Sequence, residues 1–113
     1  MQPETIGVTI TFKLPVTFHL RLITLDEENQ LRQKMFGLTE AEQAEKSYQH
    51  NVDFLADYSE VLPEGMYGDA IPKCPIPEAV RQYFSEKSVI KERTAEYAVR
   101  AYFSKLTPDI SFL

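Results

Sequence analysis

The chain contains one cysteine, two histidines and no tryptophan, and these shortages limit the chemistry it can support. Cys74 has no second thiol to pair with, so we expect a reducing compartment rather than a disulfide-bonded protein. His19 and His50 fall in different predicted elements, on the polar side of each, and no serine or cysteine stands in a recognised nucleophile motif. Paired cysteines, a His-x-x-x-His spacing and an Asp-x-Asp loop are also missing. The sequence therefore predicts no catalytic residue, no bound metal and no cofactor.

Long apolar runs and an excess of basic residues are lacking as well. Uninterrupted apolar stretches reach only two or three residues, whereas about 20 are needed to span a bilayer. The formal net charge is −5, while proteins that bind the phosphate backbone carry a concentrated basic surface. The residues from Met1 to Glu4 show no basic region followed by an apolar run, so no signal peptide is indicated. We expect a cytoplasmic protein that binds neither a membrane nor nucleic acid.

What the chain does contain is the composition of one globular domain. Its 113 residues are 43% apolar, 26% charged and 12% aromatic. A chain of this length and composition can bury enough surface to fold alone. We therefore expect a single domain over residues 1–113.

The N-terminal part has the period of a β-strand. Every even position is apolar over a stretch of seventeen residues, namely Ile6, Val8, Ile10, Phe12, Leu14, Val16, Phe18, Leu20 and Leu22. This alternation predicts strand. Pro15 cannot donate to a ladder, so we expect two strands, about 5–14 and 16–23. They pair either as an antiparallel hairpin or as one bent ribbon whose edges pair with another subunit.

The remaining chain has the period of helices. Thr24 with Glu27, and Thr39 with Glu42, have the spacing of capping boxes. They predict helices over about 25–36, which ends near Gly37, and about 40–62, which ends before Pro63. A Pro/Gly-rich loop over 63–77 follows. Residues 78–106 predict either one helix or two, about 78–87 and 89–106, with Ser88 as the second cap. The expected fold class is α+β, with a two-stranded antiparallel β element packed on three to four helices.

Acidic residues gather in the middle of the chain. Residues 26–64 hold ten acids and three bases, a net charge of −7. Asp53, Asp57, Glu60 and Glu64 recur at helical spacing and predict an acidic stripe opposite the apolar face. Such a stripe is either a solvated face or a docking surface for a basic partner.

The C-terminal helices carry more apolar residues than one stripe requires. Val99 and Phe103 lie partly off the face that Tyr102 belongs to. A second apolar face means burial on both sides or a patch that awaits a partner. We therefore take Val99, Tyr102 and Phe103, with the acidic stripe, as the candidate protein-binding residues. Within the 63–77 loop, Tyr67, Asp69 and Cys74 are the candidates for a small-molecule or enzymatic site.

The order of these parts resembles a known family. A strand with Phe-His-Leu-Arg at residues 18–21 precedes Thr-Leu-Asp-Glu-Glu at 24–28, and a long acidic helix follows with Val-Asp-Phe-Leu-Ala-Asp at 52–57. This layout resembles the small tail assembly chaperones of long-tailed bacteriophages, although those are helical with little sheet. The resemblance implies a non-enzymatic protein that binds the tape-measure protein before the tail polymerises.

Two other functions fit the same sequence. One is a small acidic inhibitor of a host defence system, which the acidic stripe favours. The other is a small ligand-binding or enzymatic domain built on the 63–77 loop. For any of the three we expect a homo-oligomer that forms at least partly through the β element, because a two-stranded ribbon alone is marginal and exposes edge amides.

Overall fold

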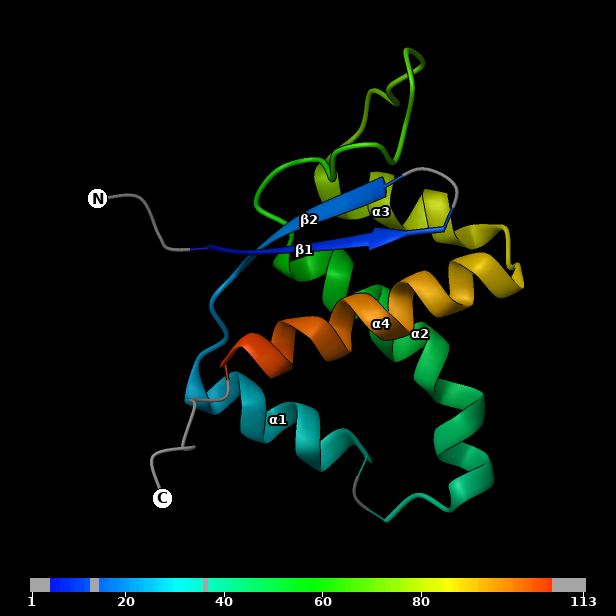
Figure 1. The fold of residues 1–113 in the computed structure, drawn as a ribbon. Coiled ribbons are helices and arrows are strands. Elements are labelled where there is room, and N and C mark those ends of the chain that lie inside the picture. Colours follow the sequence, from blue (N-terminus) through cyan, green and yellow to red (C-terminus); the bar gives the residue numbers. More distant parts are fainter. Residues whose placement is uncertain (1–4, 13–14, 36, 107–113) are drawn as a thin grey trace.

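The structure is a computed structural model that describes residues 5–12, 15–35 and 37–106. A β-hairpin precedes four helices, and the elements are β1 (Thr5–Thr11), β2 (Pro15–Arg21), α1 (Leu25–Met35), α2 (Glu40–Tyr58), α3 (Ile76–Ser85) and α4 (Val89–Leu106). The hairpin lies across α2 and α4, while α1 lies on the far side of α4 from the strands (Figure 1). This arrangement confirms the predicted α+β class with its N-terminal two-stranded element.

The two strands pair as an antiparallel hairpin rather than as a bent ribbon. The register runs from Thr5 opposite Arg21 to Thr11 opposite Pro15. The even-numbered residues face the helices, as the alternation predicts, and Val8, Phe18 and Leu20 are fully buried. Both strands are shorter than expected, and residues 13 and 14, which were assigned to the first strand, lie outside the described residues.

The outer edge of β2 is covered by the segment that follows α2. The Thr17 amide donates to the Glu64 carbonyl, and the Glu64 amide donates to the Thr17 carbonyl, both at 2.9 Å. The Glu60 amide donates to the His19 carbonyl at 3.0 Å. Residues 59–64 therefore act as a short third strand without regular pairing along their whole length.

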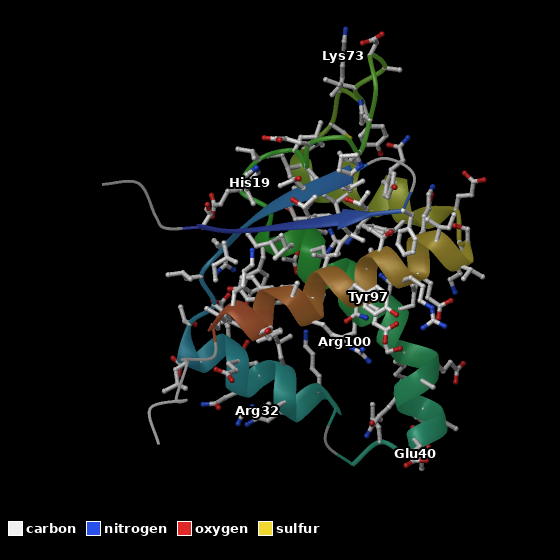
Figure 2. The ribbon with its side chains drawn as sticks, in the orientation of Figure 1. His19, Arg32, Glu40, Lys73, Tyr97 and Arg100 are labelled. Carbon is white, nitrogen blue, oxygen red and sulfur yellow. The ribbon has the colours of Figure 1, made fainter. Side chains whose placement is uncertain are left out.

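This pairing corrects the predicted end of the second helix. We expected it to reach residue 62, but α2 ends at Tyr58, and Ser59 has extended backbone angles (φ −72°, ψ 117°). The apolar residues Val61 and Leu62 continue the helical period, yet the backbone of this segment turns to β2 instead. The connection consequently spans 59–75 rather than 63–77, and Lys73 lies near its tip (Figure 2).

The core lies between the hairpin and the helices. Its buried side chains come from both strands, α2, α3, α4 and the connection, and Leu55, Val80, Ala95 and Ala98 are among them. The ring of Phe84 on α3 stacks at 6.4 Å from that of Phe18 on β2. Aromatic pairs at such distances add to the free energy of burial by about 1 kcal/mol each.

Most of the predicted helix boundaries are confirmed. Thr39 and Glu42 form a complete capping box at the start of α2, and the Glu27 amide donates to the Thr24 hydroxyl before α1. The Lys91 amide donates to the Ser88 hydroxyl, so residues 78–106 form two helices rather than one. The first of these, α3, begins and ends two residues earlier than the 78–87 we expected.

Candidate protein-binding site

Tyr102, one of the candidate protein-binding residues, is a core residue. Its side chain is fully buried, and its ring lies 5.2 Å from that of Phe54. The Tyr102 hydroxyl donates to the Arg21 carbonyl and accepts from the Ile23 amide, both at 2.7 Å. The sequence could not decide between burial and a binding patch, because the backbone groups that pair with this hydroxyl lie about eighty residues away.

Phe103 and Val99 occupy different positions from each other. Phe103 is half-buried, and its ring lies 5.4 Å from the ring of Phe54. Val99 is also half-buried, but it lines an open groove between α2 and α4. Val99 is thus the apolar candidate that lines the α2–α4 groove.

The predicted acidic stripe is divided into two parts. Asp53 and Asp57 lie on α2, and both pair with Arg81 of α3 at 3.2 and 3.1 Å. Glu60 and Glu64 lie beyond the end of α2, in the segment that pairs with β2. Glu64 reaches the imidazole of His19 at 3.3 Å. A continuous acidic helix face is therefore absent from the described structure, because the helix stops before its last two members.

The α2–α4 groove is the hollow with the largest volume, about 370 Å³, of the three described here. Ala44, Tyr48 and Val99 give it an apolar floor, and its other lining residues are Ser47, Asn51, Glu92, Arg93, Glu96 and Arg100. The Tyr48 hydroxyl donates to the Phe84 carbonyl at 2.7 Å, and burial raises the pKa of this hydroxyl. This hydrogen bond to α3 fixes the position of the Tyr48 side chain in the groove.

Charged side chains of both signs form the α4 side of this groove. Glu96 pairs with Arg93 at 3.3 Å and with Arg100 at 2.9 Å. The Arg100 guanidinium also lies 5.8 Å from the ring centre of Tyr97, whose side chain is 41% exposed. Figure 2 shows Tyr97 and Arg100 along α4, with Arg100 on the side of the helix away from the strands. Amphipathic helices bind to other proteins by placing their apolar face in a groove with apolar lining residues, and polar residues lie at the rim of such contacts.

A second hollow of about 320 Å³ lies between α1 and α2. Arg21 holds Glu27 there through two hydrogen bonds of 3.0 and 2.7 Å, and its guanidinium lies 4.0 Å from the ring centre of Tyr58. The hydrogen bonds from Arg21 hold the pKa of Glu27 well below its usual range. Burial, with a smaller contribution from Glu27, raises the pKa of Tyr58 to about 12.

His50 belongs to this second hollow. We expected an exposed imidazole, but His50 is half-buried. Its pKa is lowered mainly by burial and to a smaller extent by the nearby positive charge of Lys34. Asp53 and Asp57 also line this hollow. Acids and bases are mixed in it, and Arg21 and Glu27 are already paired, so the arrangement stabilises the attachment of α1 rather than favouring one kind of ligand.

A third and more apolar hollow, of about 210 Å³, lies where the hairpin end meets α3 and α4. Its lining residues are Ile10, Phe12, Val16, Gly65, Tyr83, Ile90 and Thr94. Phe12 is 46% exposed and Ile90 is 47% exposed. We refer to it as the hairpin-end groove.

The three loop candidates do not form a reactive cluster. The Tyr67 hydroxyl donates to the Ala79 carbonyl at 2.7 Å, and burial raises its pKa. Asp69 is exposed and Cys74 is half-buried. Within residues 5–12, 15–35 and 37–106, no group of three or more histidine, cysteine, aspartate or glutamate side chains could hold a metal ion.

Sequence reasoning located only one residue of the α2–α4 groove, Val99. Ala44 and Tyr48 follow the apolar period of the predicted second helix, and such a period cannot distinguish a buried stripe from the floor of a groove. The distinction depends on where α4 crosses α2, which is a tertiary contact. Ala44 and Tyr48 do lie four residues apart, about one helical turn. That spacing is the signal in the sequence that could have placed both side chains on one surface of the helix.

Two further findings concern the chain as a whole. Among the helices that the structure describes, none combines the length and the apolar character that crossing a membrane requires. Comparison of the chain with protein families, with curated proteins and with solved structures gave no match.

Proposed function

We propose that this chain is a non-enzymatic protein-binding protein that takes up a helical segment of its partner in the α2–α4 groove. The observation that carries the proposal is the groove itself, in which Ala44, Tyr48 and Val99 form an apolar floor beside charged residues. A hollow of this composition binds an amphipathic helix through apolar anchors spaced three and four residues apart.

The length of the groove suits about two turns of such a helix. On α2 its lining residues run from Ala44 to Asn51, and on α4 from Glu92 to Arg100. At 1.5 Å per residue these stretches are each about 11 Å long. Two anchors one turn apart fit within this length, so the groove supplies a short and specific contact rather than a whole interface.

The charges beside the groove favour one orientation of the partner. Glu92 and Glu96 alternate with Arg93 and Arg100 along α4. Charged residues around an apolar contact contribute more to the rate of association and to register than to affinity. We expect the partner helix to carry charges of both signs beside its apolar anchors.

The resemblance to small tail assembly chaperones narrows this proposal. Under it, the partner is the tape-measure protein, a long helical client, and the chain acts in the cytoplasm of the host cell as part of a phage or prophage. The Phe-His-Leu-Arg stretch at 18–21 and the helix start at 24–28 support this identity. The genomic neighbourhood tests it: we expect tail-tube and tape-measure genes on either side, and a neighbourhood without tail genes would contradict it.

The alternative of an acidic inhibitor has less support. Asp53 and Asp57 are both engaged by Arg81, and Glu64 is engaged by His19. These pairs reduce the negative charge that a basic partner would meet. The alternative of an enzymatic or ligand-binding domain is not favoured by any observation on the 59–75 connection.

One substitution on α2 tests the groove. Ala44 is exposed and lines the groove, so Ala44→Arg places a long charged side chain on its floor without removing a core contact. We expect at least a tenfold loss of affinity for the helical client, measured by titration calorimetry with purified client helix. Ala41→Arg is the matched control, because Ala41 is exposed on the same helix and does not line the groove. Equal affinity of the two variants would contradict the proposed site.

Self-association also belongs to the proposal. The sequence predicts a homo-oligomer that uses the β element, and the outer edge of β2 is occupied by residues 59–64. A contact through this element would therefore involve β1 or the apolar residues at the hairpin end.

A further inference from the structure

The hydrogen bonds of β2 define which backbone groups of β1 point away from the hairpin. Thr17 and His19 direct their backbone groups toward residues 59–64. In an antiparallel ladder, alternate residues direct both their N–H and their C=O to the same side. The even residues of β2 therefore bond to the even residues of β1. The odd residues of β1, which are Thr5, Gly7, Thr9 and Thr11, direct their backbone groups outward.

This outer edge is almost unguarded. No backbone hydrogen bond from the rest of the described chain reaches the outward groups of Thr5, Gly7, Thr9 or Thr11. The strand itself carries no charged residue. One side chain meets the edge, because the Lys105 ammonium donates to the Gly7 carbonyl. Natural proteins usually protect such an edge with charges, a proline or a bulge.

We propose that the outer edge of β1 binds an extended segment of a partner protein as an added strand, with alternate apolar side chains and an acidic residue that faces Lys105. This surface is separate from the α2–α4 groove and does not depend on it. Backbone pairing supplies the contact, and the alternate side chains of the added segment face the same side as Ile6, Val8 and Ile10.

The hairpin-end groove supports this occupant. It lies at the C-terminal end of β1, is lined by Ile10, Phe12 and Ile90 among others, and is open enough to leave Phe12 and Ile90 about half exposed. An added strand would extend past this groove and place one apolar side chain in it. The charge of Lys105 at the other end then selects an acidic residue, because the odd positions of β1 offer no charge of their own.

A second copy of the chain fits this edge less well than a lone segment. Paired strands lie about 4.8 Å apart, whereas packed helices need 8–10 Å between their axes. Since α4 packs against β1, pairing β1 with its counterpart would bring two α4 helices closer than helices can pack. An extended segment without a helix beneath it has no such conflict.

The test uses a synthetic blocked peptide of alternating valine and threonine with a central glutamate. We expect it to slow hydrogen exchange at the amides of Thr5, Gly7, Thr9 and Thr11 by at least fivefold. A twin peptide that is N-methylated on its pairing edge should leave these amides unchanged. Equal effects of the two peptides, or no effect of either at millimolar concentration, would overturn the proposal.

Variants of the protein locate the binding. Thr9→Pro removes one outward N–H and no backbone bond to β2, so we expect it to abolish the effect of the peptide. Thr9→Val keeps the N–H and, like the proline variant, loses the hydroxyl that bonds Thr17, so it is the matched control and should retain the effect. If Thr9→Pro fails to fold, the comparison of the plain and the N-methylated peptide on the wild-type protein still tests the proposal. Lys105→Glu should lower the affinity for the glutamate peptide by about threefold. It should raise the affinity for the same peptide with lysine in place of the glutamate by about the same factor. A concentration-dependent dimer that Thr9→Pro abolishes would overturn the proposal in favour of a second copy.

Discussion

At the scale of single residues, the Tyr102 hydroxyl joins α4 to the segment that links β2 and α1. It donates to the Arg21 carbonyl and accepts from the Ile23 amide, and the Tyr102 side chain is fully buried. Tyr102→Phe leaves both backbone groups without this partner, so we expect a loss of about 1–3 kcal/mol in the free energy of unfolding. Urea denaturation measures it. Tyr97→Phe, at a position 41% exposed, should change this free energy by less than about 0.5 kcal/mol.

Glu27 makes the stability depend on pH. Its hydrogen bonds from Arg21 lower its pKa in the folded state, below a value of about 4.3 in the unfolded chain. The stabilisation is therefore complete above about pH 5 and is lost as the pH falls. We expect the difference in unfolding free energy between wild type and Glu27→Gln to be largest near pH 6 and to narrow toward pH 2, as measured by urea denaturation at each pH.

The matched control for Glu27 is Glu28→Gln. Glu28 pairs with Arg32, whose side chain is 75% exposed, and exposed pairs of this kind contribute little. A Glu28→Gln profile that narrows with pH as strongly as that of Glu27→Gln would contradict the special role of the Arg21 pair.

The same residues show what sequence can and cannot predict about a candidate site. The chain contains no signal that brings Tyr102 to residues 21–23, so the apolar surplus of the C-terminal helices left burial and a binding patch as equal alternatives for it. Asp53 and Asp57 were correctly placed on one helix face. Their pairing with Arg81 could not be predicted, because it depends on how α3 packs against α2.

At the scale of elements, Gly65 ties the connection to the start of β2. Its φ is +82°, and a Cβ at this position would clash with the carbonyl oxygen of Pro15. Gly65→Ala therefore combines an unfavourable backbone conformation, about 1–2 kcal/mol, with a clash against backbone. We expect a loss of more than about 2 kcal/mol in the free energy of unfolding.

A substitution at Gly37 separates the cost of the backbone conformation from the cost of the clash, which Gly65→Ala combines. It has the same φ of +82°, but nothing lies within 4 Å of a Cβ added to it. We expect Gly37→Ala to show only the backbone effect, about 1 kcal/mol. Thermal and urea denaturation of both variants check this order, and a Gly37→Ala variant as unstable as Gly65→Ala would contradict it.

Element boundaries were predictable where a local signal exists. The capping residues Thr24, Thr39 and Ser88 set the starts of α1, α2 and α4, because a hydroxyl bonds an amide only three residues away. The end of α2 was not predictable. Residues 59–62 continue the helical period, but the backbone bonds of Glu60 and Glu64 to His19 and Thr17, more than forty residues earlier, override it.

At the scale of the whole molecule, self-association distinguishes a β1 edge that binds a segment of a partner from one that binds a second copy of the chain. The sequence predicts a homo-oligomer that forms at least partly through the β element, because a two-stranded ribbon alone is marginal. Residues 59–64 cover the edge of β2 and α4 packs against β1, so a contact between copies through this element would use the residues at the hairpin end. Sedimentation at micromolar concentration checks it, and a 13.0 kDa species at all concentrations would contradict it. The α2–α4 groove and the β1 edge are otherwise independent surfaces.

The measurement that tests the central claim most directly is a titration of the isotopically labelled chain with an amphipathic helix of the client, followed by nuclear magnetic resonance. If the α2–α4 groove binds the client, the largest chemical-shift changes will fall on Ala44, Tyr48 and Val99, which form its floor. In the Ala44→Arg variant these changes will disappear, and in Ala41→Arg they will remain. Changes centred on the α1–α2 hollow, on the 59–75 connection or on no single surface would contradict the account.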